Sequence, residues 1–249
     1  ALVTLLNEDD GYACKKAAGA IGALCSGCVA NQDYVNKSNG IVRLIELLGP
    51  KLSGDEVRAE AAGTLAILTR SNKTNQDKMA QEGGIAPLVA LLQEGTAEEV
   101  ECTAAALWSL VGGGADYDNH FENQVAIADA GGIKPLVAVL GLNAQVQEQA
   151  GGALAALALN NEQNVASIAK LIVSLLGSAD GSVASKAARA ISRLAQAGST
   201  NQVAISKAGG VELLVVLLDK AGIFDSSGSV SLSAETPENK SSETESSRG

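Results

Sequence analysis

The chain has 249 residues, of which 46% are hydrophobic and only 2% are aromatic, so we expect a core of Ala, Leu, Ile and Val in closely packed helices. The net charge of −10 excludes a general affinity for nucleic-acid phosphates, which needs clustered Lys and Arg. No apolar run approaches the ~18 residues needed to cross a bilayer, so no direct membrane insertion is expected. Four cysteines do not form a disulfide framework, and they favour a cytoplasmic or nuclear location.

The chain opens with Leu2, Val3 and Leu6, which fit the last three positions of a pattern that recurs later. We therefore expect the sequence to begin inside a helix, with part of a repeat upstream. The full pattern has apolar residues at i, i+3, i+4 and i+7, which share one face of an α-helix. It begins at Ile41, Ile85, Ile133, Ile168 and Val211, so that successive copies are 44, 48, 35 and 43 residues apart.

Each copy has similar surroundings. An Asn-Gln pair stands ten residues before four copies, at Asn31, Asn75, Asn123 and Asn201. Because asparagine is a good N-cap, we predict that each pair begins a short first helix. Glycine, which readily adopts the left-handed conformation, should end it at Gly40, Gly83-Gly84, Gly131-Gly132 and Gly209-Gly210. The copy at Ile168 follows Ala166 and Ser167 instead, so its first helix is predicted to be shortened or fused to the second.

A third helix is predicted in each repeat from a face of paired small residues followed by Leu or Ile. The small pairs begin at Ala17, Ala61, Thr103, Ala150 and Ala187. Small side chains let neighbouring helices approach closely. Glycine inside a helix costs ~1 kcal/mol relative to Ala, so Gly19, Gly63 and Gly152 are expected to mark tight contacts or an open groove floor.

A short helix, a glycine turn and two longer helices in units of about 42 residues resemble the armadillo family. HEAT repeats, the alternative, have two helices and lack this Gly-Gly turn. The resemblance implies an all-α fold, a right-handed α-solenoid (armadillo superhelix) of about five to six three-helix repeats, with the first and last incomplete. The armadillo domain would cover residues 1–222, with repeats at 1–30 (partial), 31–71, 72–119, 120–160, 161–198 and 199–222 (partial). Residues 223–249 form a Ser/Glu-rich tail of disordered composition.

Two clusters resemble sites of chemistry, and each has a plainer interpretation. Cys25 and Cys28 have redox or zinc-ligand spacing, but no second pair or nearby His completes a site, so we interpret them as ordinary thiols. An inserted loop carries Asp116, Asp118, His120 and Glu122, but it lacks the Gly and final Glu of a calcium loop. No catalytic, cofactor-binding or metal-ligating residue is expected, and the chain is not predicted to be an enzyme.

In the armadillo family the third helices line a concave groove that receives extended peptides. The resemblance places two positions of each third helix in that groove. These positions are Gly19 and Ala23, Gly63 and Ile67, Ala105 and Ser109, Gly152 and Ala156, and Arg189 and Arg193. Importin-α carries a Trp and Asn ladder in these columns, and this sequence has neither residue there. The groove is therefore not importin-α-like.

The residues at these groove positions are mostly small, and only the last third helix contributes basic ones. Lys186, Arg189 and Arg193 share one helical face in an acidic protein. Trp108, one position from the groove column, could stack on a peptide or pack between repeats. We predict that an extended or acidic segment binds along Gly63, Ile67, Trp108, Ser109, Gly152, Lys186, Arg189 and Arg193.

The sequence therefore favours a non-catalytic scaffold or adaptor whose partners are other proteins. The alternative is the substrate-recognition region of a larger enzyme, similar to the armadillo part of U-box ubiquitin ligases, which sequence upstream of Ala1 would reveal. A third hypothesis, a nuclear transport receptor, is disfavoured by the missing Trp-Asn ladder.

Overall fold

The computed structural model describes residues 1–7, 9–49, 54–112, 120–196 and 198–220. Every regular element in these ranges is an α-helix, which confirms the predicted all-α solenoid. The chain divides into two compact units, Ala1–Leu213 and Leu214–Gly249, and the described part of the second unit is the end of helix α15. The predicted tail at 223–249 lies outside the described residues.

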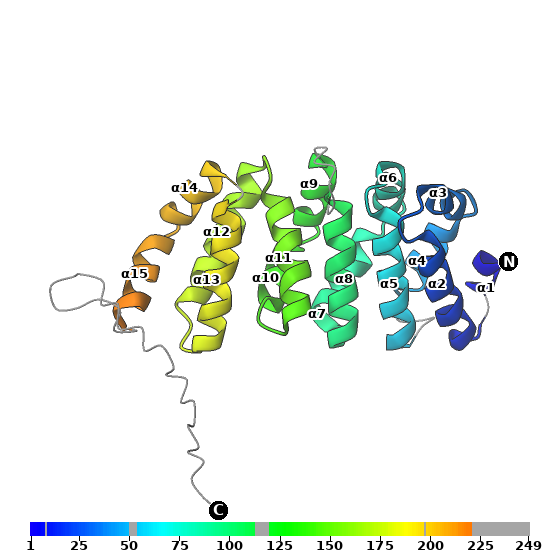
Figure 1. The fold of residues 1–249 in the computed structure, drawn as a ribbon, viewed down its shortest axis with the longest axis horizontal. Helices are drawn as coiled ribbons and strands as arrows, with labels where there is room; N and C mark the ends of the chain where they lie inside the picture. The colour runs from blue at the N-terminus through cyan, green and yellow to red at the C-terminus, as the bar shows by residue number, and fades with distance from the viewer. Residues whose placement is uncertain (8, 50–53, 113–119, 197, 221–249) are drawn as a thin grey trace, which may run out of the picture. The chain divides into compact units, whose positions relative to one another are not determined.

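The helices follow the predicted order of first, second and third. The first helices are α3 (Val29–Lys37), α6 (Lys73–Gln81), α9 (Phe121–Asp129) and α14 (Ser199–Lys207). The second helices are α1 (Leu2–Leu5), α4 (Gly40–Glu46), α7 (Ile85–Glu94), α10 (Ile133–Val139) and α15 (Gly210–Lys220). The third helices are α2 (Gly11–Cys25), α5 (Asp55–Thr69), α8 (Ala97–Leu110), α11 (Ala144–Ala158) and α13 (Gly181–Gln196). Within residues 1–213, successive third helices stand side by side (Figure 1).

Glycine turns join the first helices to the second helices, as predicted. Gly83, Gly131 and Gly209 have φ angles of 76°, 78° and 84°, a conformation that strains other residues. The second glycine of a pair must also be small, because a methyl group at Gly84 would lie 2.9 Å from Cγ of Met79. Asn39 takes the left-handed position in the first of these turns, with φ of 61°.

The fifth repeat lacks this turn. Helix α12 (Glu162–Leu176) runs without interruption for 15 residues through Ala166 and Ser167, which directly precede the second-helix pattern at Ile168 as glycines precede it in the other repeats. Of the two predicted alternatives, the fused helix is therefore the one observed.

The prediction that the repeat asparagines are N-caps is wrong. Asn75 lies inside α6, and its side-chain amide donates to the Leu68 carbonyl at the end of α5 at 2.8 Å. Asn31, Asn123 and Asn201 do the same for α2, α8 and α13, at 2.6, 2.9 and 2.9 Å. The true N-cap of α6 is Asn72, whose Oδ1 accepts from the Asn75 backbone N–H at 3.1 Å. The repeat asparagine therefore satisfies a carbonyl that the third helix leaves without an intrahelical donor.

The glutamine beside that asparagine links neighbouring third helices. The side-chain nitrogen of Gln76 donates to the Thr69 carbonyl of α5 at 2.9 Å and to the Ser109 carbonyl of α8 at 2.8 Å. Gln32 makes the equivalent bridge from α2 to α5. Because these groups are buried, an unmade bond would cost the full desolvation of each carbonyl. The bridges therefore hold the third helices at a fixed spacing.

The core is aliphatic, as the composition predicts. Leu44, Leu88 and Leu136 of the second helices have no exposed surface. Tyr12 and Tyr34, in contrast, are 70% and 71% exposed. Layers of small and branched side chains therefore carry the packing without large rings.

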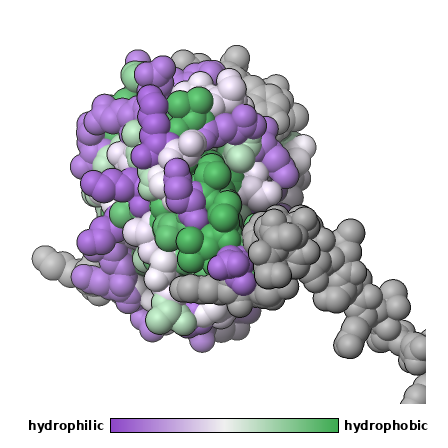
Figure 2. Space-filling view, turned by 90° about the vertical axis from the view of Figure 1, so that its left-hand side faces the viewer, coloured by the Kyte–Doolittle hydropathy of each residue, from purple (hydrophilic) through white to green (hydrophobic). Residues whose placement is uncertain are grey.

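Helix α15 presents an apolar face to solvent. Val211, Val215 and Leu218 are 51%, 50% and 39% exposed, at spacings that share one helical face. Apolar side chains gather in a patch in Figure 2. Within the described ranges, no single helix is both long enough and apolar enough to span a bilayer, and α14 and α15 pass that test only as a bent pair.

Candidate functional site

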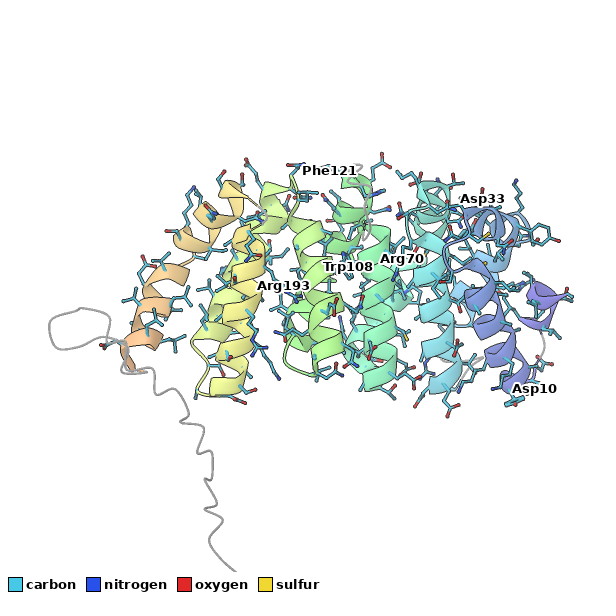
Figure 3. The ribbon with its side chains drawn as sticks, viewed as in Figure 1. Asp10, Asp33, Arg70, Trp108, Phe121 and Arg193 are labelled. Atoms are coloured by element: carbon cyan, nitrogen blue, oxygen red, sulfur yellow. The ribbon has the colours of Figure 1, made fainter. Side chains whose placement is uncertain are left out.

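The third helices share one broad surface, which we call the third-helix face: the exposed and half-buried residues of α5 with its C-cap Arg70, and those of α8, α11 and α13. Arg70, Trp108 and Arg193 lie in a row across it (Figure 3). The helices approach closely because the residues between them are small. A methyl group at Gly63, for example, would touch Sγ of Cys102 at 3.5 Å.

Trp108 of α8 packs against Gly152 of α11. A methyl group at Gly152 would lie only 2.5 Å from Cε2 of the indole and 2.7 Å from Cδ2 and Cζ2. Carbon atoms in contact are normally ~3.5–4.0 Å apart, so only glycine leaves room for the ring in this position. Trp108 is therefore half-buried against the next helix and forms part of the third-helix face.

Of the three cations predicted to share one face of α13, one is hydrogen-bonded and two are exposed. Lys186 is half-buried, and its ammonium group donates a hydrogen bond to the Gly141 carbonyl. Arg189 and Arg193 are exposed, and in the part of the chain that the structure describes neither forms a salt bridge. The Arg193 side chain reaches α11, where Nη1 would lie 3.1 Å from a methyl group at Gly151.

Ser109 does not line an open surface, which corrects the prediction for this residue. It is 2% exposed, and its Oγ lies 2.5 Å from Oγ1 of Thr69. The same hydroxyl donates to the Ala106 carbonyl at 2.8 Å. Because both neighbours are buried polar groups, Ser109 connects α8 to α5 inside the repeat interface.

Acidic side chains occupy the part of the face near the beginnings of α5 and α8. Burial, together with the carboxylates of Glu101, Glu98 and Glu60, raises the pKa of the Cys102 thiol to about 11. Glu56 forms a salt bridge of 2.6 Å with Lys15 of α2. The third-helix face therefore carries negative charge near Cys102 and positive charge at Arg70, Arg189 and Arg193.

A partly buried ion pair joins the same two helices. Arg58 of α5 donates from Nε to Oε1 of Glu99 at 2.6 Å, and the Glu99 side chain is 1% exposed. Glu99 also forms a capping box with Thr96 at the start of α8. Burial raises the pKa of Glu99, but hydrogen bonds from Thr96 and Arg58 lower it further, so the net pKa lies below its ordinary value.

Comparison with known proteins agrees with this repeat geometry, although no family model matches the chain. It is 40% identical over 91 residues to human "Armadillo repeat-containing protein 3", which covers 36% of this chain and 10% of that protein. The crystal structure of an engineered protein is 32% identical and has a TM-score of 0.69, with 87% of both chains covered. A designed armadillo repeat protein in complex with the peptide (KR)4 is 23% identical and has a TM-score of 0.67, with 88% of this chain and 91% of that chain covered.

The chain belongs to the armadillo-repeat family. It spans about a tenth of the length of the human armadillo protein that it matches. Of the predicted groove positions, Gly63, Ile67 and Gly152 are half-buried on the third-helix face of this armadillo domain.

Arg70 belongs to the third-helix face, but it was not among the residues predicted from the sequence. It is exposed, and it stands seven residues after Gly63. A spacing of seven returns to the same side of an α-helix, so extending the groove column by two turns would have found it.

The other candidate clusters of this armadillo chain gain no ligand-like geometry. Cys25 is buried, with its pKa raised by burial and by Cys28, and Cys28 is the N-cap of α3. Asp116 and Asp118 lie outside the described residues, whereas His120 is the buried N-cap residue of α9. Among the described His, Cys, Asp and Glu side chains, no group of three or more is placed to hold a metal ion.

Proposed function

We propose that this armadillo domain is a non-catalytic protein-binding scaffold, and that an extended, acidic segment of a partner binds along its third-helix face. The observation that carries the proposal is the pair of exposed arginines on α13, Arg189 and Arg193, which no described carboxylate engages. Guanidinium groups bind carboxylates through two parallel hydrogen bonds, so these contacts would fix the register of the segment.

Trp108 and Arg70 extend the same surface toward α5. The half-buried indole offers an apolar contact beside Gly152, and Arg70 offers a third cation farther along the row (Figure 3). The segment would therefore place carboxylates at the arginines and an apolar side chain near Trp108. The designed protein that binds (KR)4 takes a basic peptide, whereas the exposed cations here favour a peptide of opposite charge.

A cytoplasmic or nuclear location is part of this proposal. No disulfide joins any of the four cysteines, all of which lie within the described residues, and two of them, Cys14 and Cys25, are buried. Thiols that form no disulfide persist in reducing compartments.

The test uses two synthetic peptides of equal length, one rich in Asp and Glu with a single Leu, and its counterpart with every acid replaced by Lys. We expect the acidic peptide to bind the domain and the basic one not to bind. The double variant Arg189→Glu, Arg193→Glu should weaken binding by about two- to thirty-fold, because exposed ion pairs contribute ~0.2–1 kcal/mol each.

The matched control is Lys73→Glu, Lys78→Glu on α6, which changes the net charge by the same amount away from the third-helix face. If the control weakens binding as much as the α13 variant, the effect is one of net charge and the proposed site is wrong. Equal binding of both peptides would also contradict the proposal.

A further inference from the structure

A groove of about 790 Å³ lies between α12 and α14, and none of the third helices lines it. We call it the first-helix groove. Its apolar walls include Val165 and Ala166 of α12 and Val203 and Ala204 of α14. Val165 is buried at 3% exposure, whereas Val203 is 51% exposed. The groove thus has an apolar floor with an uncovered valine on one wall.

The groove exists because this repeat pair lacks the polar side chains that link other first helices. Between α3 and α6, Asn72 donates to Oε1 of Gln32 at 3.1 Å and to Oδ1 of Asp33 at 3.0 Å. Between the same helices, Asn36 donates to Oδ1 of Asn75 at 2.8 Å.

Aligning α12 and α14 on their repeat asparagines, Asn164 and Asn201, shows what replaces these groups. Val165 stands at the position of Gln32, Ala166 at that of Asp33, and Gly198 at that of Asn72. Within the described ranges no hydrogen bond joins α12 to α14. Smaller and apolar side chains have therefore opened the space that a polar network fills elsewhere.

Two lysines line the groove at equivalent positions. Lys170 and Lys207 each follow the repeat asparagine of their helix by six residues, and both are exposed. Neither forms a salt bridge with another described residue. Glu162 lines the groove about 12 Å farther along α12, at 1.5 Å per residue. The lysine end is therefore locally cationic in a protein of net charge −10.

We propose that the first-helix groove is a second docking site of this protein, for a partner polypeptide segment that inserts apolar side chains between Val165 and Val203 and places a carboxylate against Lys170 and Lys207. The apolar walls favour a polypeptide, because a nucleic acid offers no aliphatic side chains to fill them. This site is separate from the third-helix face, and it does not depend on the function proposed for that face.

The experiment selects binders from a displayed library of random peptides on the full chain and then measures the affinity of individual synthetic peptides. We expect selected sequences that combine Val, Ile or Leu with Asp or Glu. Their affinity should fall about tenfold in Val203→Asp, because one apolar contact is lost and the added charge repels the acidic segment. Val203→Asp gives α14 the residue that α3 has at Asp33, so the fold should tolerate it.

Two further variants keep the proposal testable if Val203→Asp destabilises the domain. Lys170→Gln with Lys207→Gln should also weaken the selected peptides, and Lys170→Glu with Lys207→Glu should reverse the charge that the library selects. The matched control is Arg189→Glu with Arg193→Glu, which should leave these peptides unaffected. The proposal is overturned if selection yields no peptide whose affinity depends on the groove residues, or if only the α13 variant weakens binding.

Discussion

Replacing Gly152 by Ala tests whether the position of the Trp108 ring requires a residue without a side chain at position 152. Alanine in place of glycine normally stabilises a helix by ~1 kcal/mol. Here the new methyl group would lie 2.5 Å from the indole, so the ring would have to move by about 1 Å to reach a normal contact distance. Overpacking of this kind costs ~1–3 kcal/mol. The free energy of unfolding should therefore stay unchanged or fall by up to about 2 kcal/mol.

Trp108 is the only tryptophan in the chain, so its fluorescence reports the ring directly. We expect Gly152→Ala to shift the emission to longer wavelength as the indole becomes more exposed, with urea unfolding measured on the same samples. The matched control is Gly63→Ala, because the methyl group there meets Cys102 at an ordinary 3.5 Å. That variant should be more stable by about 0.4–1 kcal/mol with unchanged emission. If both variants gain stability equally and emit alike, the packing of Trp108 on Gly152 is not as described.

The partly buried ion pair and the half-buried thiol of Cys102 give two further predictions. Arg58→Met should lower the free energy of unfolding by about 3 kcal/mol at neutral pH, because it leaves the Glu99 carboxylate buried without its partner. The folded-state pKa of Glu99 lies below its ordinary value of 4.5. The contribution of the ion pair is therefore fully present above pH 4.5 and is lost as the pH falls through the folded-state pKa. In urea titrations the free energies of unfolding of the two proteins should converge in acid, and a difference that stays constant with pH would contradict the ion-pair explanation. The Cys102 thiol, with a pKa of about 11, should be alkylated slowly at neutral pH, and its rate should still rise about tenfold per pH unit at pH 9.0. Peptide mass spectrometry measures the alkylation rate. A rate that has levelled off by pH 9.0 would show that the pKa of this thiol is not raised.

Most of the fold could be predicted from the sequence because its signals are local. The apolar spacing that begins at Ile85 identifies a helix by itself, and the glycine pair before it permits the sharp turn. The fused helix α12 could be anticipated in the same way, from the Ala166-Ser167 pair that replaces glycine. These features need no knowledge of what lies across the molecule.

The role of the repeat asparagine could not be predicted because its partner lies in another helix. Asparagine is equally suited to an N-cap and to holding a distant carbonyl, and the sequence alone does not distinguish the two. Asn164 shows the difficulty: it bonds the Leu157 carbonyl at 3.0 Å, yet it is followed by valine and does not form an Asn-Gln pair. The spacing from Asn161 to Asn164, which repeats that of Asn72 and Asn75, is the signal that would have revealed it.

The candidate site was predictable in part, for a related reason. The columns on the third helices correctly place Arg189 and Arg193 at the surface, where both side chains are exposed. Ser109 occupies the same column but is buried, and its hydroxyl is hydrogen-bonded to Thr69 on the neighbouring helix. Whether a position on a repeat is open therefore depends on the side chain that the adjacent repeat contributes.

The missing hydrogen bonds between α12 and α14 affect the order in which the repeats unfold. In a stack of repeats, each unit is coupled only to its neighbours, so the stability of the array is approximately a sum of local interface contributions. The junction at Val165 lacks the glutamine bridge that ties earlier units together. Amide protons of α14 should therefore exchange with solvent at a lower opening free energy than those of α5 or α8. Cooperative unfolding of residues 54–112 would then begin only after this junction has already separated.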